Sequence, residues 1–225
     1  MYRTQFLILA LALFLTGCSG QAQPEQSSTL SSDFDREMPV FYNMPEELFS
    51  IDTCPGWNKP GQKILLTGTV YQQNGQTPAP DVILYYYQTN TNGIYACDDS
   101  EERNMPKNKL GQTHGYLRGW VKTDSKGRYS IYTTRPGSYP NRNEPAHVHV
   151  HVKEPNLKEQ YYIDDIVFDN DSLLTVERRS RMENRAGSGI VKLVSQGNIY
   201  VGRRDIFLGL NIPDYPLHQT RIRLG

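Results

Sequence analysis

The chain has 225 residues, and its 24 basic and 24 acidic side chains leave no formal net charge. This balance argues against a protein that binds nucleic acid or holds an anionic membrane surface through a polybasic patch. The length is enough for one domain with a sizeable hydrophobic core.

The N-terminal segment has the features of a bacterial lipoprotein signal peptide. The apolar run 6–15 is too short to span a bilayer as a helix, and it ends in Leu15-Thr16-Gly17-Cys18, which resembles the box in which a cysteine is lipidated. We expect residues 1–17 to be removed and Cys18 to carry the lipid anchor in the cell envelope. Ser19 follows the cysteine in place of an aspartate, which favours the outer membrane of a Gram-negative bacterium. An ordinary secretory signal with an incidental cysteine is the alternative.

The next stretch, residues 18–38, is rich in serine and glutamine and has no apolar period, so it is expected to be a disordered tether. Residues 39–225 then form one folded domain. Apart from Cys18 the chain has only Cys54 and Cys97, an even number in an oxidising compartment. Either a disulfide or two separate thiols is consistent with this count.

The folded part is predicted to be mostly β-structure. Runs of β-forming residues alternate with turn signals such as Asn74-Gly75 and the hairpin Asp124-Ser125-Lys126-Gly127. One helix is predicted, over 172–185 with Ser172 as its cap. The sequence therefore predicts an all-β fold, a β-sandwich of mixed or antiparallel strands with long loops and one short helix. The expected strands are 63–71, 81–88, 117–123, 128–133, 147–152, 161–168, 190–194, 199–201 and 206–210.

Three of the five histidines, at 147, 149 and 151, occupy alternate positions in a run that also contains three valines. In a strand, side chains two apart share a face, so the imidazoles face one side and the valines the other. Such a strand offers two nitrogen ligands to one metal ion. Tyr139 lies eight residues before His147, in a turn-rich stretch that is able to bring a phenol to the same place. A solvent-exposed strand face is one alternative, and a cupin pair with Glu154 as third ligand is another.

Four segments, taken together, resemble the intradiol ring-cleavage dioxygenases, the family of protocatechuate 3,4-dioxygenase and catechol 1,2-dioxygenase. The similarity extends over roughly residues 63–171, about half of the chain. By this resemblance, 39–225 is a catalytic domain that holds a non-haem ferric ion. The matching segments are 87–95, 123–129, 135–140 and 145–149, and the implied iron ligands are Tyr95, Tyr139, His147 and His149.

The resemblance also implies the reaction and the partners. A catechol would bind as a dianion, and O2 would open the ring between the two hydroxyl carbons to give a muconate-type diacid. Tyr139 matches the ligand that leaves and accepts a substrate proton, while Tyr95 stays bound. Phenolate and imidazole suit ferric iron, which is a hard ion. His151 shares the face of the ligands and is either a supporting residue or a satisfied rim histidine. Members of the family commonly assemble, so a homo-oligomer is expected.

The sequence departs from the family pattern at two positions. Glu144 stands where the family has an arginine thought to stabilise substrate charge, and Asp165 stands where it has a glutamine. Two carboxylates would repel a catecholate unless they are paired or protonated. The arginines that are candidates to supply the missing charge from other positions are Arg142, Arg118 and Arg135.

A different class of function is also consistent with part of the chain. Residues 66–86 and the hairpin at 123–129 resemble the small transthyretin-like sandwich modules of secreted proteins. A surface lipoprotein of that kind would bind a glycan or a protein partner without chemistry. Bound ferric iron distinguishes the two hypotheses, because those modules are not expected to carry all four ligands.

Overall fold

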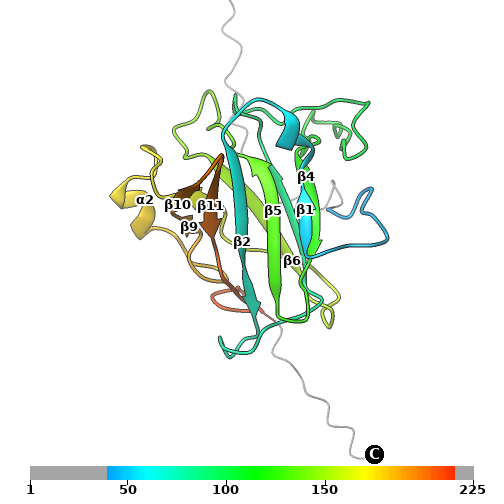
Figure 1. Ribbon diagram of the computed structural model, residues 1–225, viewed down its shortest axis with the longest axis vertical. Coiled ribbons are helices and arrows are strands. Elements are labelled where there is room, and N and C mark those ends of the chain that lie inside the picture. The colour runs from blue at the N-terminus through cyan, green and yellow to red at the C-terminus, as the bar shows by residue number, and fades with distance from the viewer. Residues whose placement is uncertain (1–39, 216–225) are drawn as a thin grey trace, which may run out of the picture.

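In the computed structural model, residues 40–215 are described, and they form two β-sheets packed face to face (Figure 1). The signal peptide, Cys18 and the predicted tether lie outside the described residues. Within 40–215, no helix combines the length and the apolar character needed to cross a bilayer. The predicted β-sandwich is confirmed for this part of the chain.

The first sheet has the strand order β1-β5-β2-β11-β10, and β12 also pairs with β2. β2 and β5 are antiparallel, whereas β1 runs parallel to β5, and β11 parallel to β2, so the sheet is mixed as predicted. Its strands are β1 (Ile51–Thr53), β2 (Lys63–Tyr71), β5 (Arg128–Thr134), β10 (Leu193–Gln196), β11 (Ile199–Arg203) and β12 (Ile206–Phe207). A 3-10 helix, η1 (Pro55–Asn58), follows β1.

The second sheet has the order β4-β3-β6-β8-β9, and β7 also pairs with β6. The histidine strand β6 is therefore central. Its antiparallel register with β3 sets Tyr87 opposite His149 and Tyr85 opposite His151. The strands of this sheet are β3 (Ile83–Gln88), β4 (Arg118–Lys122), β6 (His147–Lys153), β7 (Tyr161–Tyr162), β8 (Ile166–Phe168) and β9 (Ile190–Val191).

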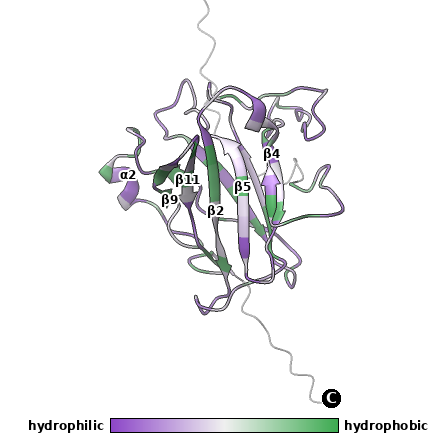
Figure 2. Cartoon of the chain, viewed as in Figure 1, coloured by the Kyte–Doolittle hydropathy of each residue, from purple (hydrophilic) through white to green (hydrophobic). Residues whose placement is uncertain are grey.

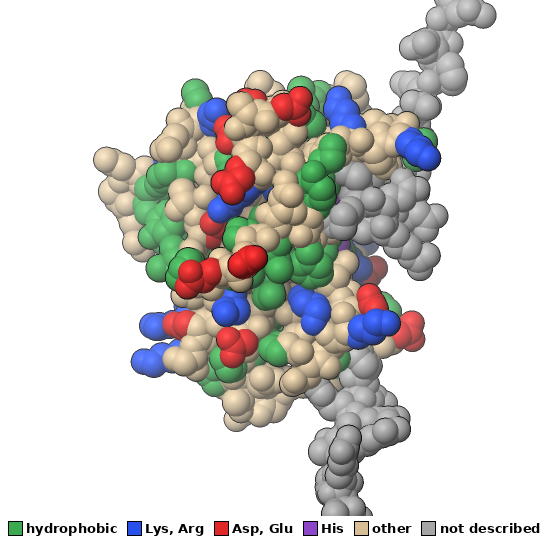
Figure 3. All heavy atoms as spheres, turned by 90° about the vertical axis from the view of Figure 1, so that its right-hand side faces the viewer, with side chains coloured by type: hydrophobic (Ala, Val, Ile, Leu, Met, Phe, Trp, Pro, Cys, Tyr) green, Lys and Arg blue, Asp and Glu red, His purple; other side chains and the backbone are tan. Residues whose placement is uncertain are grey.

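Alternation along the strands builds the core between the sheets. The valines of β6, at 148, 150 and 152, are fully buried in the same cluster as Ile64 of β2 and Ile131 of β5. The predicted division of β6 into a valine face and an imidazole face is thus confirmed. β2 is largely apolar while the connecting loops are mainly hydrophilic (Figure 2). On the face shown in Figure 3, acidic and basic side chains are interspersed.

The single strand predicted over 161–168 is divided into β7 and β8. The interruption is at Asp164, whose carboxylate accepts hydrogen bonds from the Asn184 amide at 2.8 Å and from Arg185 Nε at 3.0 Å. These side-chain bonds tie the segment to a distant loop in place of a neighbouring strand. Similarly, the strand predicted over 190–194 is divided into β9 and β10.

The predicted helix over 172–185 is too long. The helix α2 covers only Val176–Ser180, and its cap is Thr175, not Ser172, with Oγ1 accepting from the Arg178 amide. Downstream, Asn184 and Ala186 have positive φ angles of 53° and 58°, a conformation that no right-handed helix contains.

The two cysteines do not form a disulfide. Cys54 is buried and Cys97 is exposed, and both thiols are free. Of the two alternatives, a disulfide or two separate thiols, the structure therefore has the separate thiols.

Candidate metal centre

The candidate site lies on the face of the second sheet that points away from the sandwich core. There the Nε2 atoms of His147 and His149, two residues apart on β6, lie 3.2 Å from each other. The Tyr87 ring on β3 stacks against the His149 ring at 4.4 Å. This face also carries a second apolar cluster, which includes Tyr85, Tyr87 and Trp120 and packs against Tyr95.

Two phenols reach the same point from separate loops. Tyr95 comes from the β3–β4 connection and Tyr139 from the β5–β6 connection, and their hydroxyl oxygens are 2.5 Å apart. The Tyr95 hydroxyl lies 2.8 Å from His149 Nε2, and the Tyr139 hydroxyl lies 3.4 Å from the same atom. The structure therefore brings the four predicted ligand side chains together.

The two loops approach so closely because glycines line their contact. Gly93 has a φ of +76°, and a Cβ there would lie 1.9 Å from the Ser138 carbonyl oxygen. A Cβ at Gly137 would lie 2.4 Å from the Thr91 carbonyl oxygen. The Gly137 amide also donates to the Asn90 carbonyl at 2.9 Å. Since only glycine fits at such separations, these positions fix how near Tyr95 and Tyr139 lie.

The hydrogen bonds of the two histidines direct one nitrogen of each ring to the cluster. His147 Nδ1 lies 2.7 Å from the Pro145 carbonyl oxygen, which only accepts, so this nitrogen carries the proton. His149 Nδ1 lies 2.7 Å from the Asp165 carboxylate and 2.9 Å from the Tyr162 hydroxyl. Each Nε2 is left with a lone pair, the tautomer needed to ligate a metal. That of His149 faces the two phenols, and His147 Nε2 lies beside it.

Burial makes Tyr95, Tyr139 and His147 prefer their neutral forms. It raises the pKa of Tyr139 to about 12 and the pKa of Tyr95 well above its usual 10. Burial and the neighbouring His149 lower the pKa of His147. A multivalent cation among these atoms would reverse the preference of the phenols, because it stabilises phenolate.

The donor set fits a ferric ion. Metal–ligand bonds of about 2 Å place adjacent ligand atoms about 3 Å apart. The two hydroxyl oxygens are 2.5 Å apart, and His149 Nε2 lies 2.8 to 3.4 Å from both of them and from His147 Nε2. Oxygen and nitrogen donors without thiolate suit a hard ion. Asp165 also lies near His147 and His149, the three groups having ligand atoms within 4.8 Å of one another. However, Asp165 contacts Nδ1 of His149, on the ring edge away from the phenols.

Both unexpected carboxylates have partners. Burial alone would raise the pKa of Asp165, but the His149 and His147 rings and hydrogen bonds from His149 and Tyr162 outweigh it, so the pKa is lowered. Glu144 lies 3.7 Å from Arg142 Nη1. The guanidinium of Arg142 in turn lies over the Tyr139 ring, 5.5 Å from its centre. Of the candidate arginines, Arg142 is thus the one placed against the cluster.

The other two candidate arginines have contacts elsewhere. Arg118 is fully buried, donates to the carbonyls of Arg103 and Tyr42 at 2.7 Å each, and lies over the Trp120 ring. These contacts make it a support for the outer apolar cluster. Arg135 has its own set of partners, namely the Asp171 carboxylate at 3.9 Å and the Phe168 ring.

His151 is a buried residue and not a rim residue. It is 2% exposed, and its Nδ1 lies 2.6 Å from the Gln160 amide oxygen. Its ring packs edge-on against Tyr162, 5.1 Å between centres. Its neighbours on β3 and β7 are aromatic, which explains why a histidine at the end of this row is enclosed.

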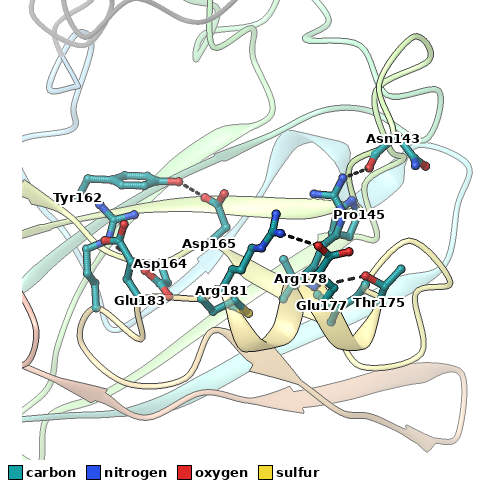
Figure 4. A pocket seen from close by; sticks show the side chains of 14 residues that line it. Asn143, Pro145, Tyr162, Asp164, Asp165, Thr175, Glu177, Arg178, Arg181 and Glu183 are labelled. Atoms are coloured by element: carbon teal, nitrogen blue, oxygen red, sulfur yellow. Dashed lines mark hydrogen bonds and ion pairs between the residues drawn. The ribbon is translucent and has the colours of Figure 1, made fainter.

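Two cavities border the cluster. One of about 420 Å³ is lined by Tyr95, Tyr139 and Arg142. The other, of about 550 Å³, has Tyr162, Asp165 and residues of α2 in its wall. In Figure 4 the Tyr162 hydroxyl points at Asp165, while Arg181, the C-cap of α2, pairs with Glu177. Both volumes lie in the range of small-molecule sites and accommodate a single aromatic ring.

Comparison with known proteins agrees with this site. A family model described as dioxygenase matches residues 39–186. The protocatechuate 3,4-dioxygenase beta chain of Burkholderia cepacia is 32% identical over 95 residues, which cover 40% of this chain and 37% of that protein. This chain therefore spans well under half the length of that relative. The protein belongs to the intradiol dioxygenase family.

Solved structures show the same fold. The dioxygenase domain of a carbohydrate-binding fusion protein from Streptomyces sp. SirexAA-E matches with a TM-score of 0.52 at 20% identity, covering 73% of this chain and 94% of that one. Catechol 1,2-dioxygenase from Pseudomonas arvilla C-1 matches with a TM-score of 0.53 at 20% identity, covering 77% of this chain and 61% of that one.

Sequence reasoning missed Tyr162 and the two glycines at the loop contact. Tyr162 lies in a run of ordinary β-forming residues, so nothing local marks it. Gly93 lies in the matching segment 87–95, but its contact with a loop more than forty residues away has no sequence signal.

We predict that Gly93→Ala reduces ferric iron binding at least tenfold while the sheets remain folded, because the added methyl pushes the Tyr95 and Tyr139 loops apart. Gly111→Ala is the matched control, since Gly111 has a similar φ of +78° but no atom within 4 Å of a built Cβ. The measurement is bound iron per protein at increasing ferric concentration, with circular dichroism as a check on folding. Equal iron binding by the two variants would contradict the role given to this contact.

Proposed function

We propose that the protein is a non-haem ferric intradiol dioxygenase that cleaves catecholic rings with O2 between the two hydroxyl carbons. The observation that supports this most is the convergence of two phenol oxygens and two imidazole nitrogens: the Tyr95 and Tyr139 oxygens and the His147 Nε2 atom each lie within 2.8 to 3.4 Å of His149 Nε2. The ligands in this proposal are Tyr95, Tyr139, His147 and His149. The product is a muconate-type diacid that contains both atoms of the O2 molecule.

Iron would supply the chemistry that no side chain provides: a ferric ion held by these residues binds the two catechol oxygens and activates the ring for reaction with O2. The protein fixes the geometry of the ligands and surrounds the catechol ring with a small cavity. The Nδ1 hydrogen bonds of both histidines prevent the rings from turning, so each Nε2 remains aimed at one point.

Tyr139 is the residue that we assign to proton transfer. A catechol that bound at the centre as a dianion would give up two protons. The Tyr139 oxygen would accept one of them, and the other would pass to water in the adjoining cavity. Tyr139 is the more peripheral phenol, 3.4 Å from His149 Nε2 compared with 2.8 Å for Tyr95. It also lines the smaller cavity, where the released phenol has room.

The first prediction from this function is turnover. The iron-loaded protein is expected to consume one O2 for each catechol and to form a muconate product absorbing in the ultraviolet. An oxygen electrode and mass spectrometry after reaction in ¹⁸O2 measure both quantities, and protein stripped of iron is the control. An iron-loaded protein that leaves catechol, protocatechuate and hydroxyquinol unchanged would favour the non-catalytic binding module.

The second prediction concerns Arg142. Arg142→Gln is expected to lower kcat about tenfold, less than the 10²–10³ typical of a buried stabilising donor, because the Arg142 side chain is 32% exposed. Iron content should remain that of the wild type, since Arg142 lies over the Tyr139 ring, pairs with Glu144 and is not one of the four proposed ligands. Arg128→Gln, an exposed arginine paired with Asp124 in the β4–β5 hairpin, is the control. Loss of iron in Arg142→Gln, or an unchanged kcat, would show that the assignment is wrong.

We also propose that the protein is lipid-anchored through Cys18 in the cell envelope, in the outer membrane of a Gram-negative bacterium. The sequence Leu15-Thr16-Gly17-Cys18 and the apolar run before it support this proposal. In a Gram-negative host, the full chain should incorporate labelled palmitate and fractionate with outer membranes. Cys18→Ala should be unlabelled and absent from the membrane fraction. A labelled Cys18→Ala chain would contradict an anchor at this residue.

A further inference from the structure

The two histidines of the centre are held by different kinds of group. His147 Nδ1 faces a neutral carbonyl, that of Pro145, at 2.7 Å, whereas His149 Nδ1 faces the Asp165 carboxylate at 2.7 Å. We infer that Asp165 and Tyr162 form a positioning pair that holds His149 and strengthens it as an iron ligand. This inference rests on the proposed iron site but not on the proposed reaction.

The contacts within the pair are mutual. The Tyr162 hydroxyl donates to Asp165, and its oxygen is also 2.9 Å from His149 Nδ1. One carboxylate oxygen, Oδ1 of Asp165, therefore accepts from the imidazole and from the phenol. The three groups form a closed triangle, so the His149 ring is fixed in both tilt and rotation.

An outer layer of contacts keeps Asp165 and Tyr162 in place. The neighbouring residue Asp164 pairs with Arg185, and its carbonyl accepts from the buried Arg204 at 2.5 Å. The guanidinium of Arg185 lies 5.2 Å from the centre of the Tyr162 ring. At Gly189 a Cβ would lie 2.1 Å from the Asp165 carbonyl oxygen, so β9 can approach this backbone only with glycine. A side chain held by so many contacts is suited to fix the orientation of its neighbour.

A carboxylate that accepts from a ligating histidine strengthens the metal bond more than a carbonyl does. A metal-bound imidazole that donates to an anion gives more electron density to the metal than one that donates to a neutral group, and loss of such partners typically costs 10–100-fold in metal affinity. The asymmetry between Asp165 and Pro145 thus makes His149 the stronger of the two nitrogen ligands. Electron donation through His149 also favours the ferric over the ferrous state.

The test compares iron release and colour in four variants. Ferric protein is mixed with excess chelator, and the decay of the tyrosinate-to-iron band gives the dissociation rate. We expect Asp165→Ala to release iron about 10- to 100-fold faster than the wild type, and Asp165→Asn and Tyr162→Phe to release it faster by a smaller factor. The band of Asp165→Asn should lie at longer wavelength, because the iron has lost electron donation. Asp165→Glu should restore part of the wild-type rate and wavelength.

The matched control is Asp169→Asn, which removes an aspartate from the same segment that pairs only with Arg179 at the surface. It should behave as the wild type. Wild-type iron release and band position in both Asp165→Asn and Asp165→Ala would overturn the inference. Because turnover is not measured, failure of the dioxygenase reaction would leave this result standing, and the two outcomes remain distinct.

Discussion

The antiparallel pairing of β3 with β6 is the constraint on which the site depends. This register sets Tyr87 beside His149 and buries the β6 valines against the first sheet. Because side chains alternate along a strand, a shift of one residue would move both histidines into the core and the valines outward. The cost of exposing three valines and burying imidazoles therefore protects the ligand geometry. The register that packs the sandwich core therefore also positions His147 and His149.

Tyr95 and Tyr139, the two proposed oxygen ligands, are positioned in a different way. Neither Tyr95 nor Tyr139 belongs to a strand, so the sheet does not place them. They are placed by backbone-to-backbone contact of two loops, at Gly93 and Gly137, where no side chain fits. The centre is thus half on a rigid strand and half on loops that hold each other. This division agrees with the role proposed for Tyr139 in proton transfer, since a loop residue can move without disturbing the sheets.

The two acidic side chains near the site, Glu144 and Asp165, are paired with groups that their own positions in the sequence do not indicate. Glu144 and Asp165 replace an arginine and a glutamine of the family pattern, and by themselves they would repel a catecholate. In the structure Glu144 is partnered by Arg142, and Asp165 by His149 and Tyr162. Both carboxylates are therefore engaged by neighbouring side chains, which reduces their repulsion of a catecholate.

The structure could be predicted from the sequence where the periodicity of apolar residues and the turn signals are strong. The alternation in β6 and the Asp124–Gly127 hairpin gave the correct faces and turn, and β2 has the predicted bounds. Element boundaries that depend on long-range contacts could not be predicted in this way. The breaks at Asp164 and after Ser180 come from contacts with distant loops, and β1 is too short to show a period. The partners of Asp165 and Arg118 likewise depend on the tertiary fold.

We propose that two tyrosines and two histidines hold a ferric ion that a catechol can reach. The most direct measurement is the visible and resonance Raman spectrum of the ferric protein, before and after catechol is added. We expect a broad visible band with tyrosinate vibrations, and a shift of that band to longer wavelength with catechol. A protein that remains colourless with ferric iron, or an iron band without tyrosinate vibrations, would show that the tyrosines do not bind iron.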